Sequence, residues 1–158
     1  ALCLGGAEMG RRARFRRAAK LASVAASEGR IVTLGVVPTE ASSAYGYIEP
    51  ASAGLAEVRA FVEKPDAATA AQYIANGYLW NSGNFIVRAD VLHDEIEVAT
   101  AGLSDAVAAS FTEATVDGAS IFLGKRFAAA PKISIDYAVM ERTQRASVLP
   151  VDLSLIHI

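Results

Sequence analysis

The sequence predicts an α/β fold in which helices and strands alternate, and two neighbouring segments carry most of that prediction. Residues 11–29, RRARFRRAAKLASVAASEG, place apolar residues at helical spacing and end on Gly29, a residue typical of the C-terminal end of a helix. Residues 30–38, RIVTLGVVP, form a continuous apolar run that stops at a proline. Such a run is typical of a strand covered on both faces. Helix and strand patterns then alternate to the end of the chain, which favours layers of helices on a sheet.

The later elements follow from the same signals. Residues 55–65 predict a strand, and Asp66 is placed to cap a short helix that Gly77 closes. The remaining expected elements are a strand at NFIV, a helix beginning at ADVLHDEIE, an alanine-rich helical stretch over residues 100–130 with a break near Asp117 and Gly118, a helix that Ser134 can cap, and a strand at SVLPVD.

Composition excludes several classes of protein. The chain has 158 residues, of which 53% are hydrophobic and 20% charged, which is typical of one folded domain and not of a disordered chain. A net charge of −2 gives no general reason to bind nucleic acid or an anionic membrane. No apolar run approaches the roughly 20 residues that a membrane span needs. The single cysteine, Cys3, leaves no internal disulfide, which is compatible with the cytoplasmic location we expect.

Polar residues interrupt an apolar segment at YLWNSGNFIV, residues 78–87. This pattern predicts a polar tip on a rigid apolar base, as many binding sites have. Asn81 and Asn84 each offer a donor and an acceptor, which suits sugar hydroxyls, and Gly83 lets a ligand approach the backbone. An ordinary turn rich in Asn and Gly is the alternative.

A second polar group lies at FVEKP, where Glu63 and Lys64 end a strand before a proline. A carboxylate accepts hydrogen bonds from paired hydroxyls, and an ammonium suits phosphate. Both can reach one ligand only if the strand bends, and an exposed ion pair is the alternative. Gly46, in YGYIE, stands among aromatic residues that can pack on a sugar face. Asp136 falls in the first turn of a predicted helix, where it binds a ligand or caps the helix.

A resemblance to a known family rests on four segments together: FVEKPDAATAAQYI, YLWNSGNFIVRADVL, PKISIDYAVMERT and VLPVD. In this order and at these intervals they resemble the bacterial mannose-1-phosphate guanylyltransferases, or GDP-mannose pyrophosphorylases, over about residues 15–152. The resemblance implies a Rossmann-like nucleotidyltransferase domain with a mixed sheet, often followed by a β-helix or an isomerase domain. It implies formation of GDP-mannose and pyrophosphate from mannose 1-phosphate and GTP, with Mg²⁺.

By that resemblance, Glu63 would hold mannose hydroxyls and Lys64 the sugar phosphate. The other residues that it assigns to the sugar pocket are Gly46, Asn81, Asn84 and Asp136. The reaction would be an in-line attack of the sugar phosphate on the α-phosphorus of GTP, in which the protein positions the reactants and a metal offsets charge.

The chain departs from the family pattern at both ends. The family opens with a Gly-rich triphosphate loop, absent here, and a later strand ends in Leu-Pro-(Ala or Ser)-Asp-His, whose Asp is a metal ligand. LGGAEM, residues 4–9, stands in that place, with Ala7 at the Asp. After LPVD the family continues Gly-Trp-x-Asp-x-Gly, where this chain has LSLIHI. We therefore expect residues 1–152 to be the sugar-binding half of the domain, without its N-terminal nucleotide-binding part, and not to turn over GTP alone.

The last six residues, LSLIHI, match the translation of a transposase adapter used in sequencing libraries, CTG TCT CTT ATA CAC ATC. We interpret residues 153–158 as adapter read-through, the alternative being a short apolar tail. Near the other end, six of the 15 basic residues fall in residues 11–20. This cluster is either a patch for phosphate or nucleic acid, or a solvated helix face, or the product of a damaged reading frame.

Other functions stay open from the sequence. A nucleotidyltransferase for another sugar is compatible with FVEKP, and a non-catalytic sugar-phosphate-binding protein would need no metal carboxylates. We expect small-molecule partners, no nucleic acid and no membrane, with a homo-oligomer as a possible assembly.

Overall fold

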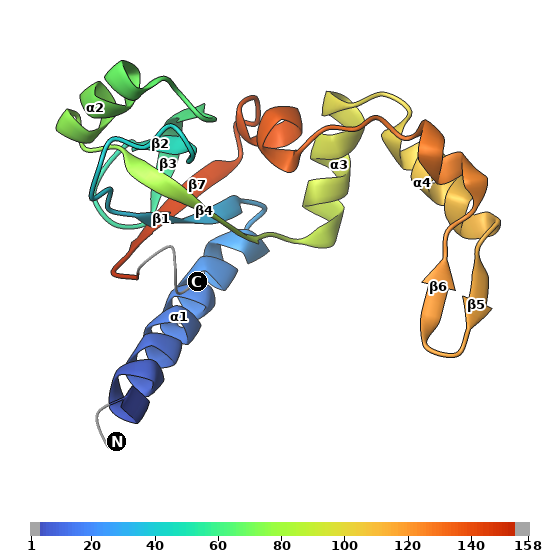
Figure 1. Cartoon of the computed structure of the whole chain (residues 1–158), viewed down its shortest axis with the longest axis horizontal. Helices are drawn as coiled ribbons and strands as arrows, with labels where there is room; N and C mark the ends of the chain where they lie inside the picture. Colours follow the sequence, from blue (N-terminus) through green and yellow to red (C-terminus); the bar gives the residue numbers. More distant parts are fainter. Residues whose placement is uncertain (1–3, 154–158) are drawn as a thin grey trace.

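The computed structural model describes residues 4–153, and its centre is a five-stranded sheet that closes on itself (Figure 1). The strands are β1 (Ile31–Val36), β2 (Tyr47–Pro50), β3 (Ala56–Val62), β4 (Leu79–Ile86) and β7 (Ala146–Val151). They neighbour one another in the order β1, β4, β2, β3, β7. β1 and β7 are parallel, whereas the other neighbours are antiparallel, so the predicted mixed sheet is confirmed.

Helices cover this sheet and continue into an arm at one side. The helical elements are α1 (Leu4–Ser27), α2 (Ala67–Ala75), α3 (Ala89–Ala99), α4 (Leu103–Thr112), the 3-10 helix η1 (Lys125–Ala129) and the π-helix η2 (Asp136–Met140). Figure 1 shows α4 and a small hairpin extending away from the sheet. Within residues 4–153, no helix is both long and apolar enough to cross a membrane.

β1 is the strand buried on both faces, as its continuous apolar run predicts. All six of its residues are buried. On one face Val32 and Leu34 pack against α1, and on the other Ile31 joins the cluster formed with α3 and η2. The α1 residues in the first of these contacts are Ala18, Ala22 and Ala25. Their small side chains let the helix lie close to the strand, which fixes β1 as the centre of the layered core.

The predicted helix ends are confirmed at three positions. The Asp66 carboxylate accepts a hydrogen bond of 2.8 Å from the backbone N of Thr69, which satisfies a free N–H in the first turn of α2. Gly29 and Gly77 follow α1 and α2 with φ of +90° and +78°, a backbone conformation that glycine adopts without strain. These caps set where each helix stops and the next strand begins.

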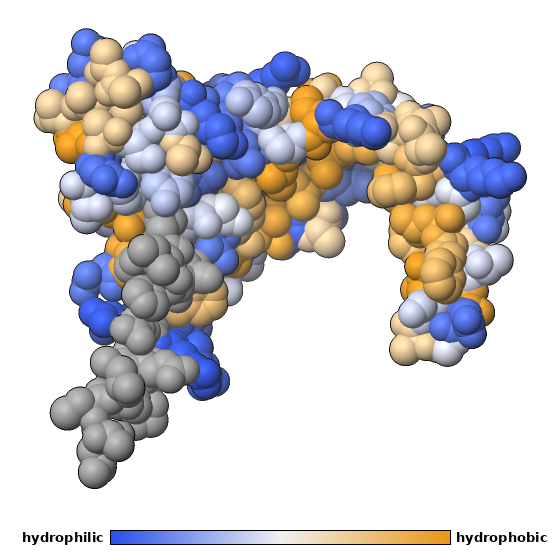
Figure 2. Space-filling model, in the orientation of Figure 1, coloured by the Kyte–Doolittle hydropathy of each residue, from blue (hydrophilic) through white to orange (hydrophobic). Residues whose placement is uncertain are grey.

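The prediction that residues 100–130 are helical is wrong in its second half. α4 ends at Thr112, and β5 (Thr115–Asp117) pairs with β6 (Ser120–Phe122) in a two-stranded hairpin. Gly118 takes the turn at φ +58°, and the flanking residues are mostly β-branched or aromatic, which favours strands over helix. Apolar side chains of this hairpin are exposed, as the orange surface of the arm in Figure 2 shows.

The comparison of residues 4–9 with a strand end is also wrong. Their backbone forms the first turns of α1, which runs without a break to Ser27. Leu, Ala, Glu and Met favour helices although Gly5 and Gly6 do not, and the Ala- and Arg-rich sequence that follows continues the same helix. At the other end, Leu153 is buried, with 9% of its surface exposed, and residues 154–158 lie outside the described residues. The adapter interpretation stays a prediction.

Gly35 tests how tightly the centre of the sheet is packed. A Cβ at this position would lie 2.7 Å from Leu79 Cδ1 and 2.7 Å from Val148 Cγ2, both in the core. We expect Gly35→Ala to lower the free energy of unfolding by about 1–3 kcal/mol, because the core must shift to admit the methyl group. Gly10→Ala is the control, since a Cβ there meets nothing within 4 Å. Urea denaturation of both variants measures the difference, and equal midpoints would contradict this packing.

Candidate functional site

The polar residues of the segment YLWNSGNFIV, predicted as a polar tip before a strand at NFIV, lie inside a strand. β4 runs through them without ending. Between Asn81 and Phe85, however, three residues of β4 lie opposite only one residue of β1, Leu34. Gly83, at φ +71°, lies in the middle of this bulge. A bulge re-aims the side chains beside it, and here it is the feature that presents the polar groups.

Asn81 stands at the edge of this bulge, in β4, and is hydrogen-bonded to β1, to η2, to its own strand and to the loop residue before β2. Its side-chain Nδ2 donates to Asp136 Oδ1 of η2 at 3.0 Å. Its Oδ1 accepts from Thr33 Oγ1 of β1 at 2.9 Å and from the backbone N of Gly83 at 3.1 Å. Its backbone N donates to the carbonyl of Gly46 at 2.8 Å. The amide is therefore held on both of its ends and points toward Asp136.

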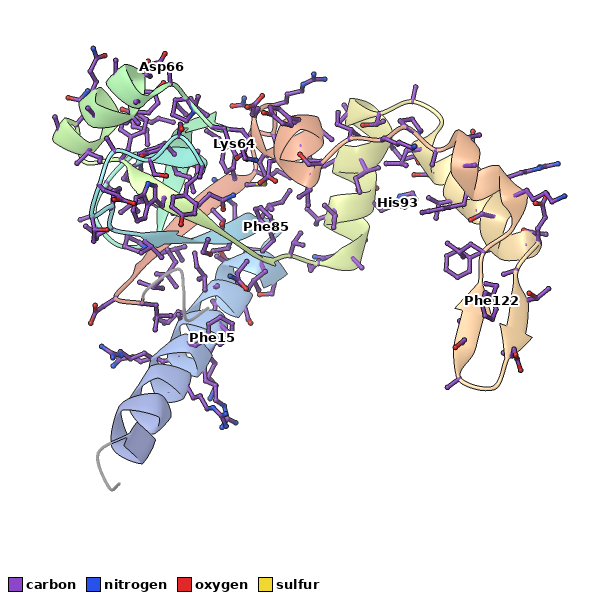
Figure 3. The ribbon with its side chains drawn as sticks, viewed as in Figure 1. Phe15, Lys64, Asp66, Phe85, His93 and Phe122 are labelled. Atoms are coloured by element: carbon purple, nitrogen blue, oxygen red, sulfur yellow. The ribbon has the colours of Figure 1, made fainter. Side chains whose placement is uncertain are left out.

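Glu63 and Lys64 can both reach one ligand only if the strand bends between them, and the chain does bend directly after β3. Lys64 has φ +48°, the one positive value at a non-glycine position among the described residues. Lys64 Nζ and Glu63 Oε1 form an ion pair of 2.7 Å, so both charged groups lie on the same side. The Glu63 side chain is 9% exposed and that of Lys64 is 57% exposed. Figure 3 shows Lys64 beyond the end of the strand, before the start of α2 marked by Asp66.

These groups surround a cavity of about 360 Å³. Its lining residues are Ala44, Tyr45, Gly46, Glu63, Asn81, Ser82, Gly83 and Asp136. At Gly46 a Cβ would come within 2.5 Å of Glu63 Oε2, so the absence of a side chain lets the Glu63 carboxylate lie over the backbone. The structure thus brings together four residues predicted from sequence (Gly46, Glu63, Asn81 and Asp136), with Lys64 joined to them through Glu63.

Asn84, like Lys64, does not itself line this cavity. Its Nδ2 donates to the carbonyl of Ser82 at 3.1 Å, inside the bulge. Sequence reasoning missed Thr33 and Ser82, and it included Tyr45 only as one of the aromatic residues of YGYIE that can pack on a sugar face. A signal for Thr33 was present, since it is a hydroxyl residue within the apolar run IVTLGVV. Tyr45 and Ser82 stand next to singled-out residues, but nothing in their spacing indicated which way their side chains face.

Two carboxylates share this cavity, and their environment raises the pKa of one of them. Burial raises the pKa of Asp136 first, and the nearby negative charge of Glu63 raises it further. The hydrogen bond from Asn81 and the charge of Lys64 act in the opposite direction and do not cancel the rise. The cavity therefore offers carboxylate acceptors, an amide donor and an adjacent ammonium, a set that suits a ligand with several hydroxyls and an anionic group.

The charge of Glu63 can be removed to test this account of Asp136. We expect Glu63→Gln to lower the pKa of Asp136, measured by ¹³C NMR of the carboxyl carbon as a function of pH. A carboxyl whose folded-state pKa is raised loses stabilisation as pH rises from the unfolded value through the folded one. The variant should therefore lose less stability over that pH interval than the original protein. A pKa of Asp136 that does not move would show that Glu63 exerts no field there.

A larger cavity of about 560 Å³ lies on the other side of Tyr45, which lines both cavities. Its lining is mainly apolar, and includes Val36, Val37, Trp80, Pro150, Val151 and Leu153. The clustered hydrogen-bonding and charged groups are in the smaller cavity, so we place the candidate site there despite its size.

The magnesium ion implied by the resemblance finds no matching ligand set in the described part of the chain. Among residues 4–153 there is no group of three or more His, Cys, Asp or Glu side chains that could hold a metal ion. Glu63 and Asp136 are only two carboxylates, and they contact Lys64 and Asn81 respectively. These residues do not fit a magnesium site.

Comparison with known proteins gives consistent results. The model of the nucleotidyl transferase family matches residues 1–126. The xanthan biosynthesis protein XanB of Xanthomonas campestris is 43% identical over 143 residues, which are 89% of this chain and 31% of that protein. The mannose-1-phosphate guanylyltransferase of Escherichia coli is 40% identical over 147 residues, which are 87% of this chain and 31% of that enzyme. The chain thus spans about a third of the length of the curated relatives that it matches.

Solved structures agree on the fold. A Helicobacter pylori structure named mannose-6-phosphate isomerase superposes with a TM-score of 0.83 at 25% identity, covering 91% of this chain and 58% of that one. A Thermus thermophilus structure named mannose-1-phosphate geranyltransferase gives 0.73 at 34% identity, covering 87% and 40%. The expected mixed α/β nucleotidyltransferase fold is confirmed. With a family match over most of its length, relatives near 40% identity and this fold, the chain belongs to the nucleotidyl transferase family.

Proposed function

We propose that this chain supplies the sugar-phosphate-binding part of an enzyme that forms GDP-mannose and pyrophosphate from mannose 1-phosphate and GTP. The observation that carries the proposal is the cavity in which Glu63, Asn81 and Asp136 converge beside the Lys64 ammonium. Relatives named mannose-1-phosphate guanylyltransferase, at 39% identity in Sinorhizobium fredii and 40% in Escherichia coli, support the choice of sugar and nucleotide.

In this proposal the cavity binds the sugar by its hydroxyls. The Glu63 carboxylate, mostly buried and held over Gly46, accepts hydrogen bonds from two neighbouring hydroxyls. Asp136, whose pKa is raised by burial and by the charge of Glu63, accepts from a further hydroxyl when ionised and donates when protonated. Such a set discriminates strongly between sugars, because a hydroxyl of the wrong configuration leaves a buried carboxylate oxygen unpaired.

Lys64 holds the phosphate at the rim. Its ammonium is more than half exposed and lies 2.7 Å from Glu63 Oε1, so it can contact a phosphate on the open side while the sugar lies inward. A phosphate oxygen then attacks the α-phosphorus of GTP in line, forming a new P–O bond as the bond to the leaving pyrophosphate breaks. The contribution of these residues is to position and orient the attacking group.

Binding of mannose 1-phosphate to the chain tests the site directly. We expect calorimetry to detect mannose 1-phosphate binding and to show at least tenfold weaker binding for mannose, which lacks the phosphate that Lys64 contacts. Glu63→Gln should weaken mannose 1-phosphate binding about tenfold or more, since one charged acceptor is lost.

Glu40→Gln is the matched control for that variant, because it replaces the same carboxylate by the same amide in a residue that lines the larger cavity. We expect it to bind mannose 1-phosphate like the original chain. Equal losses in the two variants, or equal affinity for glucose 1-phosphate and mannose 1-phosphate, would overturn the assignment of this cavity to mannose.

We also propose that the 158-residue chain does not turn over GTP by itself. No Gly-rich loop of the kind that holds a triphosphate occurs in its sequence, and the described carboxylates form no metal site. An assay of pyrophosphate release with mannose 1-phosphate, GTP and Mg²⁺ should stay at the level without protein. Release above that level, proportional to protein concentration, would contradict the proposal and show that the chain holds the nucleotide without such a loop.

A further inference from the structure

Thr33 is a polar side chain with no exposure to solvent in the most buried strand of the protein. It is 0% exposed, and its neighbours along β1 are apolar. It faces the same side of the strand as Gly35, which is paired with Asn81 across the start of the bulge. Its Oγ1 lies 2.9 Å from Asn81 Oδ1. A buried hydroxyl costs free energy unless it is hydrogen-bonded, and the contact with Asn81 supplies the hydrogen bond that offsets this cost for Thr33.

The groups around the Asn81 amide fix the direction of each hydrogen bond. The backbone N–H of Gly83, 3.1 Å away, can only donate, so the atom facing it must be the carbonyl oxygen Oδ1. The Asp136 carboxylate on the other side accepts from Nδ2 at 3.0 Å. Thr33 faces Oδ1 and must therefore donate its hydroxyl proton to Asn81. Rotating the amide by half a turn would break both bonds to Oδ1 and set the oxygen against a carboxylate.

We propose that Thr33 is a positioning residue for the sugar cavity. Its hydroxyl holds the Asn81 amide with the N–H group, and not the carbonyl, directed toward Asp136 and the ligand. Thr33 does not line the cavity and touches no ligand. It acts through Asn81. With the amide held in this orientation, β4 presents the N–H donor of Asn81 in the cavity that also contains the carboxylate acceptors Glu63 and Asp136. This inference rests on the proposed function, because it assigns Thr33 a part in recognising the same sugar phosphate.

Two substitutions separate the hydroxyl of Thr33 from its methyl group. Thr33→Val keeps the shape and removes the donor, whereas Thr33→Ser keeps the donor and removes the methyl. We expect Thr33→Val to weaken mannose 1-phosphate binding about tenfold and Thr33→Ser to stay within about threefold of the original chain. A purely structural role for Thr33 would instead make Thr33→Ser, which leaves a cavity, lose as much affinity as Thr33→Val.

A readout without ligand keeps this inference separable from the proposed function. In ¹H–¹⁵N spectra of the whole chain, the Asn81 side-chain amide should give one sharp pair of resonances, unchanged in Thr33→Ser but shifted and broadened in Thr33→Val. In the original chain the Thr33 hydroxyl proton should exchange slowly and show a cross-peak to Asn81, a result that does not require any variant to fold.

Each outcome decides a different question. Unchanged Asn81 resonances in Thr33→Val, or a rapidly exchanging Thr33 hydroxyl, would overturn the positioning role even if mannose 1-phosphate binds. A shifted Asn81 amide in Thr33→Val, in a chain that binds no mannose 1-phosphate at all, would support the orienting contact and reject the function proposed for the cavity.

Discussion

The pairing of β1 with β4 is the interaction on which the rest of the site depends. β1 is buried on both faces, so its position is fixed by α1 on one side and by the cluster with α3 and η2 on the other. β4 must accommodate two more residues than β1 between Asn81 and Phe85, and the bulge that results is anchored to this immobile partner. A polar constellation carried by such a strand keeps its geometry without a ligand, which reduces the conformational cost of binding.

Charge balance is the second constraint on the cavity. Glu63 is nearly buried, and its charge is offset by Lys64, which the left-handed backbone at Lys64 turns to the same side. The negative charge of Asp136 is only partly compensated by the hydrogen bond from the Asn81 amide, so the pKa of Asp136 remains raised. A ligand that brings several hydroxyls satisfies both carboxylates at once. A polyhydroxylated ligand with one anionic group therefore suits the cavity better than an apolar one, which would leave the carboxylates without donors.

Sequence alone predicted the alternation of elements and most of the polar residues that the fold gathers around the candidate cavity, because those signals are local. A few neighbouring residues suffice to predict the cap at Asp66, the buried run of β1 and the charged pair after β3. The hairpin after α4 was missed because the alanine-rich composition of the segment outweighed its β-branched residues. The helical start of α1 was missed because residues 4–9 were compared with a strand end of the family, which outweighed their helix propensity. The bulge and the contact of Thr33 with Asn81 join residues 48 positions apart, a distance at which periodicity carries no information.

The measurement that tests the central claim most directly is an amide chemical-shift map of the chain during titration with mannose 1-phosphate. Two cavities compete as the binding place, and of their lining residues within the described chain they share only Tyr45. The account predicts that the largest shifts fall on Gly46, Asn81 and Gly83, which line the smaller, polar cavity. Shifts concentrated at Val37, Thr39 and Glu40, which line the larger cavity and not the polar one, would contradict it and move the sugar-phosphate site to the larger cavity.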